Sequence, residues 1–176
     1  MFAIVIWDMR DQTVHLFRDR AGIKPLYYYF NGRHFAFASE LKALEAAIPA
    51  DELRVDETAL YDFLGYRYIP APKTLYKDCF KLQPGHKVTF ELRQGHLSPA
   101  VPYWELDPIP RSSLSLTQAC EELRGLIGSA VSDQMIADVP LGFFLSGGVD
   151  SSVVVASAAA RKTEIDTFSI VFDSEA

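Results

Sequence analysis

Short apolar runs separated by polar turns characterise the first forty residues, and they predict β-hairpins. Residues 2–8 and 14–19 are expected to form two strands of one hairpin. Residues 26–30 and 34–38 predict a second hairpin around Asn31-Gly32, a pair that favours tight turns. Both faces of the 2–8 strand are apolar, so we expect that strand to be covered on both sides.

Helices and a proline-rich loop follow these hairpins. A short helix is expected over residues 40–47, and Asp56 is expected to open a second helix. Two prolines hold residues 66–75 as an extended loop, and residues 87–92 predict a further strand. The three consecutive tyrosines at positions 27–29 are expected to pack in a core rather than to form a binding platform.

Proline density marks a change of organisation near residue 100. Four of the chain's ten prolines lie between residues 99 and 110, which is typical of a stiff connector. The next helix is expected to begin at Ser115, because Ser115 and Gln118 match a capping box, and to end at Asp138-Val139-Pro140. Its apolar positions recur at helical spacing and are expected to cover a sheet: Ala119, Leu123, Ile127, Ala130 and Val131.

The most informative pattern lies near the C-terminus. An apolar run (141–145), a helical run (152–161) and a second apolar run (167–172) predict the strand, helix and strand of a parallel sheet. Between the first two runs lies Ser146-Gly147-Gly148-Val149-Asp150-Ser151. In such units a ligand binds at the carboxyl end of the strand against the helix N-terminus, and adjacent glycines let the backbone approach an anion closely. The sequence therefore predicts a phosphate cradle here, with serine hydroxyls as further donors.

Alternatives for this loop remain open. The two glycines could make a turn only, with Asp150 capping the next helix, since Asp and Ser are preferred N-caps. The loop is not a Walker A loop, and the chain contains no G-x-G-x-x-G motif. Beside phosphates, Asp150 would be repelled unless Mg²⁺ bridges them or its side chain pins the loop's own N–H groups. Both roles of Asp150 stay open at this point.

Composition narrows the class of protein. With 49% hydrophobic and 23% charged residues, the chain is globular in type. A net charge of −6 without a Lys/Arg cluster argues against a nucleic-acid surface, and no apolar stretch approaches the length of a membrane span. Cys79 and Cys120 lack metal-ligand spacing, which indicates a reducing, cytoplasmic setting and no zinc site. The four histidines are expected to be surface or hydrogen-bonded residues, and Arg18-Asp19 either forms a functional pair or fixes the turn at Gly22.

The motifs carry a family resemblance. Residues 146–151 resemble the PP-loop, Ser-Gly-Gly-x-Asp-Ser, of the ATP pyrophosphatase families. Residues 137–152, Ala-Asp-Val-Pro-Leu-Gly-Phe-Phe-Leu-Ser-Gly-Gly-Val-Asp-Ser-Ser, are similar to the signature of glutamine-hydrolysing asparagine synthetases. Upstream segments resemble the same family, in one order along the chain: 2–8, 18–19, 22–28, 38–44, 75–76 and 82–86. The chain is thereby identified as a member of that family.

The resemblance implies a chain of α/β and α+β class. It implies the end of an N-terminal-nucleophile-type antiparallel β-sandwich, followed by the start of a parallel α/β PP-loop domain of the adenine nucleotide α-hydrolase type. The expected divisions are the C-terminal part of a class II glutamine amidotransferase domain (1–98), a Pro-rich linker (99–113) and the N-terminal part of an ATP-binding domain (114–176). We therefore expect an internal fragment of a longer enzyme.

The family pattern also predicts what the chain lacks. Class II glutaminases use an N-terminal cysteine, directly after the initiator Met, as nucleophile, whereas this chain has Phe2. Cys79 and Cys120 are internal and cannot take that role, so no catalytic residue is expected in this chain. The family's later Ser-Gly-Glu-Gly-x-Asp-Glu segment is also missing, and we expect the chain alone to be inactive.

By resemblance, the whole enzyme hydrolyses glutamine to ammonia, adenylates the β-carboxylate of aspartate with ATP and releases asparagine, AMP and pyrophosphate. The implied cofactors are ATP and Mg²⁺, and the implied partners are small-molecule substrates, not nucleic acid or a membrane, with a homo-oligomer of the whole protein left open. The implied ATP-binding residues are Phe144 and Leu145 in the pocket lining, Ser146, Gly147, Gly148, Asp150 and Ser151 at the phosphates and metal, and Ile170 at the adenine.

Two other interpretations stay open. Asparagine synthetase-like amidotransferases or cyclases share the loop and the tandem domains but act on another carboxylic acid. Alternatively, the chain is a non-catalytic remnant with a structural or regulatory role.

Overall fold

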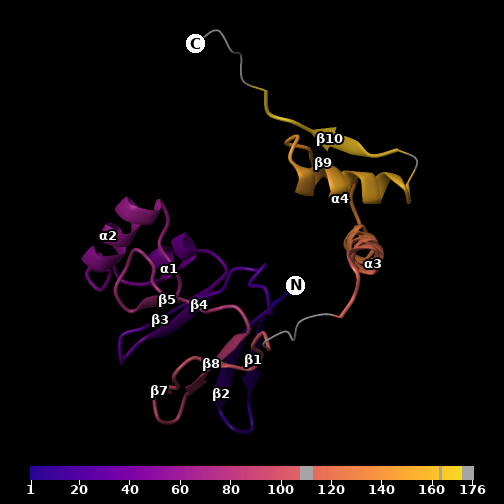
Figure 1. Ribbon diagram of the computed structural model, residues 1–176. Coiled ribbons are helices and arrows are strands. Elements are labelled where there is room, and N and C mark those ends of the chain that lie inside the picture. The colour runs from indigo at the N-terminus through magenta and orange to yellow at the C-terminus, as the bar shows by residue number, and fades with distance from the viewer. Residues whose placement is uncertain (108–112, 163, 172–176) are drawn as a thin grey trace. The chain divides into compact units, whose positions relative to one another are not determined.

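The computed structural model describes residues 1–107, 113–162 and 164–171, and it divides into two compact units (Figure 1). Unit 1 comprises Met1–Pro108 and contains most of the strands. Unit 2 comprises Ile109–Ala176 and contains two helices and one pair of short strands in its described part. Pro108, Pro110 and the residues after them up to Ser112 belong to the expected linker and lie outside the described residues.

The larger sheet of unit 1 is antiparallel throughout. Its main path runs β1-β2-β6-β7, and β8 pairs with β6 beyond this path. The predicted first hairpin is confirmed, because β1 pairs with β2 in register from Ala3↔Arg18 to Asp8↔Thr13. The strands are β1 (Ala3–Asp8), β2 (Thr13–Arg18), β6 (His86–Glu91), β7 (His96–Leu97) and β8 (Val101–Pro102).

A second, smaller sheet and two helices complete unit 1. Its order is β4-β3-β5, and the turn between β3 and β4 contains Asn31-Gly32, as predicted. Asp56 is the N-cap of α2, where its side chain accepts a hydrogen bond from the Thr58 amide at 2.9 Å. The elements are β3 (Tyr27–Phe30), β4 (Phe35–Ala38), β5 (Cys79–Lys81), α1 (Leu41–Ala47) and α2 (Glu57–Tyr66).

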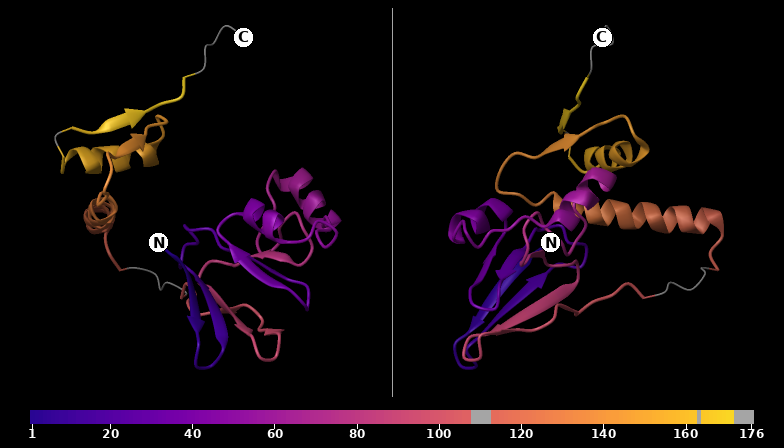
Figure 2. Two further views of the ribbon diagram at one scale, coloured as in Figure 1. Left: turned by 180° about the vertical axis from the view of Figure 1, so that it is seen from behind. Right: turned by 90° about the vertical axis from the view of Figure 1, so that its left-hand side faces the viewer.

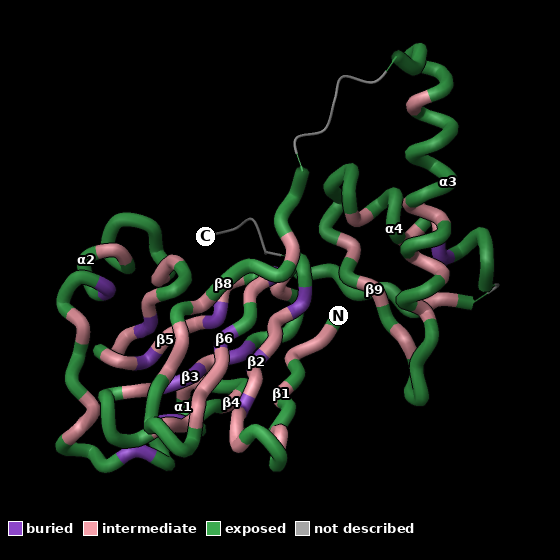
Figure 3. Tube along the Cα trace, turned by 90° about the horizontal axis from the view of Figure 1, so that it is seen from below, coloured by how far each residue is buried: buried purple, intermediate pink, exposed green. Residues whose placement is uncertain are grey.

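The core of unit 1 forms between the two sheets and beneath α1 (Figure 3). The cluster between the sheets consists of Val14, Leu16, Leu26, Tyr28, Leu82 and Val88. On the opposite face of β3, Tyr29 and Cys79 pack with Leu44 and Ile48 of the α1 region. Tyr28 and Tyr29 therefore face different layers and are both buried, which confirms that these tyrosines pack in the core.

The outer face of β1 differs from the expectation. Ile4 and Ile6, which share one face of the strand, are 42% and 50% exposed, so the prediction that both faces of this strand are covered is wrong for the described residues. Ala3 and Val5 do pack against the core between the sheets. The apolar pattern was correct for one face only, because the described part of the chain places no element against the other.

Arg18 and Asp19 fix the turn at Gly22. The Arg18 guanidinium donates to three backbone carbonyls, those of Gly22 (2.8 Å), Lys24 (2.9 Å) and Leu82 (2.7 Å). The buried Asp19 carboxylate accepts four backbone amides at 3.0–3.2 Å, from Phe2, Ala21, Ile23 and Lys24. Of the two roles left open for this pair, the structural one accounts for these contacts.

The end of unit 1 is held on its sheet. β8 pairs with β6, the Tyr103 hydroxyl donates to the Arg18 carbonyl at 2.6 Å, and the Trp104 amide donates to the Gly85 carbonyl at 3.2 Å. A Cβ on Gly85 would lie 2.6 Å from the Trp104 carbonyl oxygen, so the close approach requires glycine. Residues 101–104, which fall in the expected linker, are thus attached to unit 1.

Unit 2 contains a parallel strand pair with a helix between the strands in sequence (Figure 2). β9 and β10 pair in register from Gly142↔Asp166 to Phe144↔Phe168, which is the predicted strand-helix-strand order. The predicted capping box at Ser115 and Gln118 is present at the start of α3. The elements are α3 (Leu116–Gln134), β9 (Gly142–Phe144), α4 (Val149–Ala159) and β10 (Asp166–Phe168).

Three expectations for unit 2 are corrected. α3 ends at Gln134, before Asp138-Val139-Pro140, and none of its residues is buried. Ile127 and Val131 are half-buried, whereas Leu123 is 56% exposed, so the apolar stripe packs only partly in the described residues. β10 is shorter than the predicted run 167–172, and Phe172 lies outside the described residues.

Candidate functional site

The Ser-Gly-Gly loop connects β9 to α4, as the sequence predicts. Gly147 has a φ of 81°, in the left-handed region that L side chains rarely adopt. No heavy atom lies within 4 Å of the position that a Cβ would take on Gly147, so this side of the loop is open. The glycine is therefore required by the backbone conformation rather than by packing.

Backbone donors of this loop are unused. Within the described part of the chain, the amides of Ser146, Gly147 and Gly148 have no hydrogen-bond acceptor. Gly148 is the N-cap of α4 and offers no side chain to the first helical turn. A helix start without a capping side chain leaves N–H groups that favour an anion.

Serine hydroxyls gather beside these amides. The Ser146 and Ser151 Oγ atoms lie 3.2 Å apart. Ser151 and Ser152 Oγ both donate to the Gly148 carbonyl, at 3.2 and 2.8 Å, and with the Ser151 hydrogen used there Ser146 is the donor to Ser151. The hydroxyls thus close the loop onto α4, and a bound oxyanion could accept from Ser146 and Ser151 in place of their present acceptors.

Asp150 does not cap α4. The N-cap is Gly148, and Asp150 lies in the first turn, so the alternative in which Asp150 caps the helix is wrong. Among the described residues, its carboxylate has no hydrogen bond or ion pair, so pinning of the loop's own N–H groups is not seen. An acidic side chain in a first turn is stabilised by the helix dipole and remains available for a cation.

The remaining predicted residues lie at the same edge of the strand pair. Phe144 ends β9 and Ile170 follows β10 by two residues, and they are 83% and 81% exposed. Leu145 is half-buried, and its amide donates to the Phe168 carbonyl at 2.8 Å. Because the carboxyl ends of parallel strands meet at one edge of a sheet, the structure brings all eight residues to one end of this unit.

Sequence reasoning missed Ser169. Its hydroxyl donates to the Leu145 carbonyl at 2.6 Å and so connects the end of β10 with the start of the loop. A serine inside the predicted apolar run 167–172 carries no motif, and the partner lies 24 positions away. No local pattern could have identified this contact.

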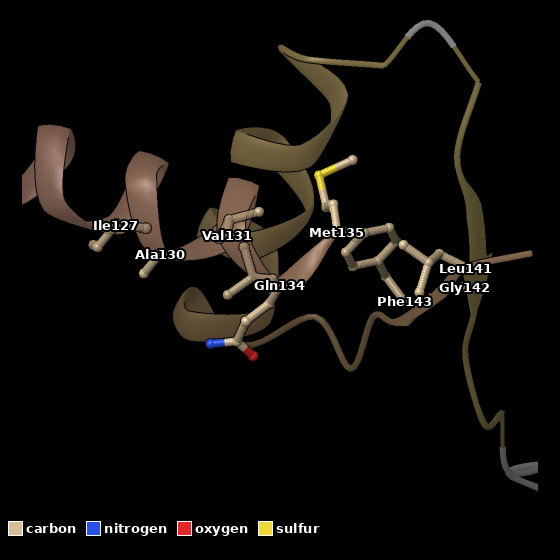
Figure 4. A pocket seen from close by; sticks show the side chains of 9 residues that line it. Ile127, Ala130, Val131, Gln134, Met135, Leu141, Gly142 and Phe143 are labelled. Atoms are coloured by element: carbon tan, nitrogen blue, oxygen red, sulfur yellow. The ribbon is translucent and has the colours of Figure 1, made fainter. Parts of the chain in front are cut away.

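An apolar cavity of unit 2 is separate from the loop (Figure 4). It has a volume of about 420 Å³ and lies between α3, the β9 region and Val154 of α4. Gln134 is the one polar side chain among the residues that line this cavity, and none of residues 144–151 lines the cavity. The cavity therefore does not belong to the predicted phosphate cradle. Its other lining residues are Ile127, Ala130, Val131, Met135, Leu141, Gly142 and Phe143.

The cysteine and the hydrogen-bonded histidines of unit 1 are described by their surroundings. Cys79 is buried, and burial, with Asp78 and Glu45 nearby, raises the pKa of its thiol to about 11. His15 hydrogen-bonds through both ring nitrogens to Thr13 and Thr89, and His34 pairs with Glu52 at 3.0 Å. The histidines were expected to be surface or hydrogen-bonded residues. His15, His34 and His86 are hydrogen-bonded, and the partner of His86 is the Pro84 carbonyl.

Nowhere in residues 1–107, 113–162 and 164–171 do three or more His, Cys, Asp or Glu side chains gather as metal ligands would. The helices in these ranges are all too short or too polar to cross a membrane.

Comparison with known proteins places both units in one family. Residues 1–104 match the family model of the glutamine amidotransferase domain, and residues 122–176 match that of asparagine synthase. The antiparallel two-sheet arrangement with helices in unit 1 is consistent with a glutaminase domain.

Individual relatives agree with the family models. The chain is 37% identical to a putative glutamine-hydrolysing asparagine synthetase 2 of Methanocaldococcus jannaschii, over 99% of this chain and 34% of that protein. It is 34% identical to the glutamine-hydrolysing asparagine synthetase 1 of Bacillus subtilis, over 99% of this chain and 27% of that protein. A third relative, amidase chry2 of Gibberella zeae, is 31% identical over 87% of this chain and 22% of its own length. The chain thus spans about a third or less of these relatives, and it belongs to the family of glutamine-hydrolysing asparagine synthetases.

Proposed function

We propose that residues 144–151 and Ile170 bind ATP in an enzyme that forms an amide from a carboxylic acid with glutamine as the nitrogen source. The observation that carries the proposal is the loop at 146–148, which has a left-handed Gly147 with open space on its Cβ side and three unused amides beside an uncapped helix start. Such backbone donors suit phosphate oxygens, because they need no rearrangement to bind them.

The residues present fit ATP with Mg²⁺. Ser146, Gly147, Gly148 and Ser151 would hold phosphate oxygens, and the carboxylate of Asp150 would hold the cation. Phe144, Leu145 and Ile170 offer apolar surface at the same edge for the base. When bound, Mg·ATP would supply the adenylyl group that activates a carboxylate, and this chain's amides and hydroxyls would orient its phosphates while Asp150 would hold the cation.

For the whole protein we propose the reaction of asparagine synthetase. ATP, aspartate, glutamine and water give asparagine, glutamate, AMP and pyrophosphate, by way of a β-aspartyl-adenylate. Within this reaction, residues 1–98 would contribute to the glutaminase domain and residues 114–176 to the ATP-binding domain, with 99–113 between them. The names of the relatives in M. jannaschii and B. subtilis support this assignment.

The test is an assay of the purified whole protein, of which this chain is a part, with Mg·ATP, glutamine and aspartate. We expect asparagine, AMP and pyrophosphate in equal amounts, together with binding of Mg·ATP to the 176-residue chain itself. Formation of ADP and phosphate would contradict the proposed cleavage between the α and β phosphates. If the chain binds no Mg·ATP, residues 146–151 are not a phosphate cradle, and the non-catalytic interpretation is favoured.

The main alternative function is the same kind of reaction with another carboxylic acid in place of aspartate. The match to amidase chry2 shows that a relative at similar identity carries a different name. A panel of carboxylic acids in the same assay separates the two functions, because AMP release would then depend on an acid other than aspartate.

Glutamine hydrolysis gives a further expected result. We expect the 176-residue chain to release no ammonia from glutamine, because Cys79 is a buried thiol with a pKa of about 11 and Cys120 lies on α3 of unit 2. Ammonia and glutamate are measured after incubation with glutamine. Turnover that disappears in Cys79→Ala or Cys120→Ser would show that the nucleophile lies within this chain.

A further inference from the structure

Two hydrogen bonds tie Leu145, the residue that enters the loop, to the strand after it in sequence. The Leu145 amide donates to the Phe168 carbonyl at 2.8 Å, and the Ser169 hydroxyl donates to the Leu145 carbonyl at 2.6 Å. Both partners come from consecutive residues at the end of β10, Phe168 and Ser169. The backbone of Leu145 is therefore held on its amide side and on its carbonyl side.

The second bond replaces a bond of the sheet. In a parallel pair, the next backbone amide to reach the Leu145 carbonyl would be that of Ile170. Among the described residues no backbone amide reaches it, and pairing ends at Phe144 and Phe168. The Ser169 side chain thus satisfies the carbonyl while the two backbones separate, which leaves the Ile170 amide unpaired at the edge where the proposed ATP site lies.

The carbonyl of Leu145 and the amide of Ser146 belong to one planar peptide unit. Cis peptide bonds in the described residues are confined to Ala71-Pro72, so this unit is trans and its C=O and N–H point in opposite directions. Fixing the carbonyl towards Ser169 therefore fixes the Ser146 N–H away from β10. That N–H is the first of the three unused amides of the loop.

We propose that Ser169 is a positioning residue, whose hydroxyl sets the orientation of the Ser146 amide and thereby the first phosphate donor of the loop. That the ligand is ATP rests on the proposed function. The orientation of the Ser146 amide by Ser169 rests on the two hydrogen bonds of Leu145 alone. Ser169 itself does not touch the phosphates in this assignment; it acts through the peptide between Leu145 and Ser146.

The experiment compares Ser169→Ala, Ser169→Thr and Ser157→Ala in the full 176-residue chain. Threonine keeps the hydroxyl and alanine removes it. Ser157→Ala is the matched control, because Ser157 is a serine of unit 2 whose hydroxyl also donates to a backbone carbonyl, that of Val153 at 2.8 Å, and it lies in α4 away from the loop. Mg·ATP affinity is measured by calorimetry, and the Ser146 amide and Leu145 carbonyl resonances are measured by NMR without ligand.

We expect Ser169→Ala to weaken Mg·ATP binding roughly threefold to tenfold, the range of one hydrogen bond, and to shift both resonances. Ser169→Thr should restore affinity and resonances, and Ser157→Ala should change neither. Wild-type affinity in Ser169→Ala, or unshifted resonances, would overturn the proposal. If the unaltered chain binds no Mg·ATP, the proposed function fails, and the resonances alone then decide whether Ser169 orients the Ser146 amide.

Discussion

Gly147→Val is expected to remove Mg·ATP binding from the chain. A β-branched side chain at a φ of 81° costs on the order of 1–3 kcal/mol, and no packing compensates, because no atom lies within 4 Å of its Cβ. The loop is expected to relieve this strain by turning its amides, so that they no longer converge on one anion. Calorimetry should show affinity reduced at least tenfold, which corresponds to about 1.4 kcal/mol.

Gly32→Val is the matched control for Gly147→Val. Gly32 has a φ of 87° and likewise no atom within 4 Å of a Cβ, but it lies in the β3–β4 turn of unit 1. It should carry a similar backbone cost and leave Mg·ATP binding unchanged. Unaltered affinity in Gly147→Val, in a chain that binds Mg·ATP, would refute the assignment of phosphate to this loop.

Asp19→Ala is expected to destabilise unit 1 by about 3–5 kcal/mol, because four backbone amides would lose their common acceptor and the replacement cannot supply another. Both tryptophans of the chain, Trp7 and Trp104, lie in unit 1, so tryptophan fluorescence during urea unfolding follows this unit. Asp11→Ala removes an exposed carboxylate from the β1–β2 turn and should change the free energy of unfolding by no more than about 0.5 kcal/mol. Equal effects of the two substitutions would mean that the Asp19 contacts contribute little.

The same carboxylate makes the stability of unit 1 depend on pH. Burial alone would raise the pKa of Asp19, but the amides of Lys24, Ile23 and Phe2 outweigh it and lower the pKa from 3.8 to about 2. A carboxylate whose pKa is lower in the folded than in the unfolded state stabilises the folded state. This contribution is complete above the pKa of the unfolded state, and it is lost as the pH falls through the pKa of the folded state. The difference in stability between the unaltered chain and Asp19→Asn should therefore be constant above about pH 4 and shrink towards pH 2. A difference independent of pH would contradict this account.

Local signals in the sequence predicted most of the elements. Asn31-Gly32, the Asp56 N-cap and the Ser115–Gln118 capping box each act within a few residues, and each is found in the structure. The exposure of one face of β1 could not be predicted in this way, because an apolar pattern does not show whether another element packs against that face. Ile4 and Ile6 have the same residue type as core positions, yet they are 42% and 50% exposed.

The candidate site likewise has one part that the sequence predicts and one part that it does not. Residues 146–151 form a contiguous motif, and the strand-helix-strand order alone brings Ile170 to the same edge. The contact between Ser169 and Leu145 joins positions 24 apart, and that between Arg18 and the Leu82 carbonyl joins positions 64 apart. Such contacts depend on how whole strands meet, so only the folded arrangement reveals them.

The attached end of unit 1 has a mechanical consequence. Tyr103 and Trp104 are bonded to the carbonyls of Arg18 and Gly85, and Arg18 in turn holds the turn that contains Asp19. β8 is paired with β6, and Tyr103 is bonded to Arg18, the last residue of β2, so tension on the chain beyond residue 104 would act first on these contacts at the ends of β2 and β6. A pull in that direction has to break the β6–β8 pairing and the bonds of Tyr103 and Trp104 before it can extend residues 101–104 away from unit 1.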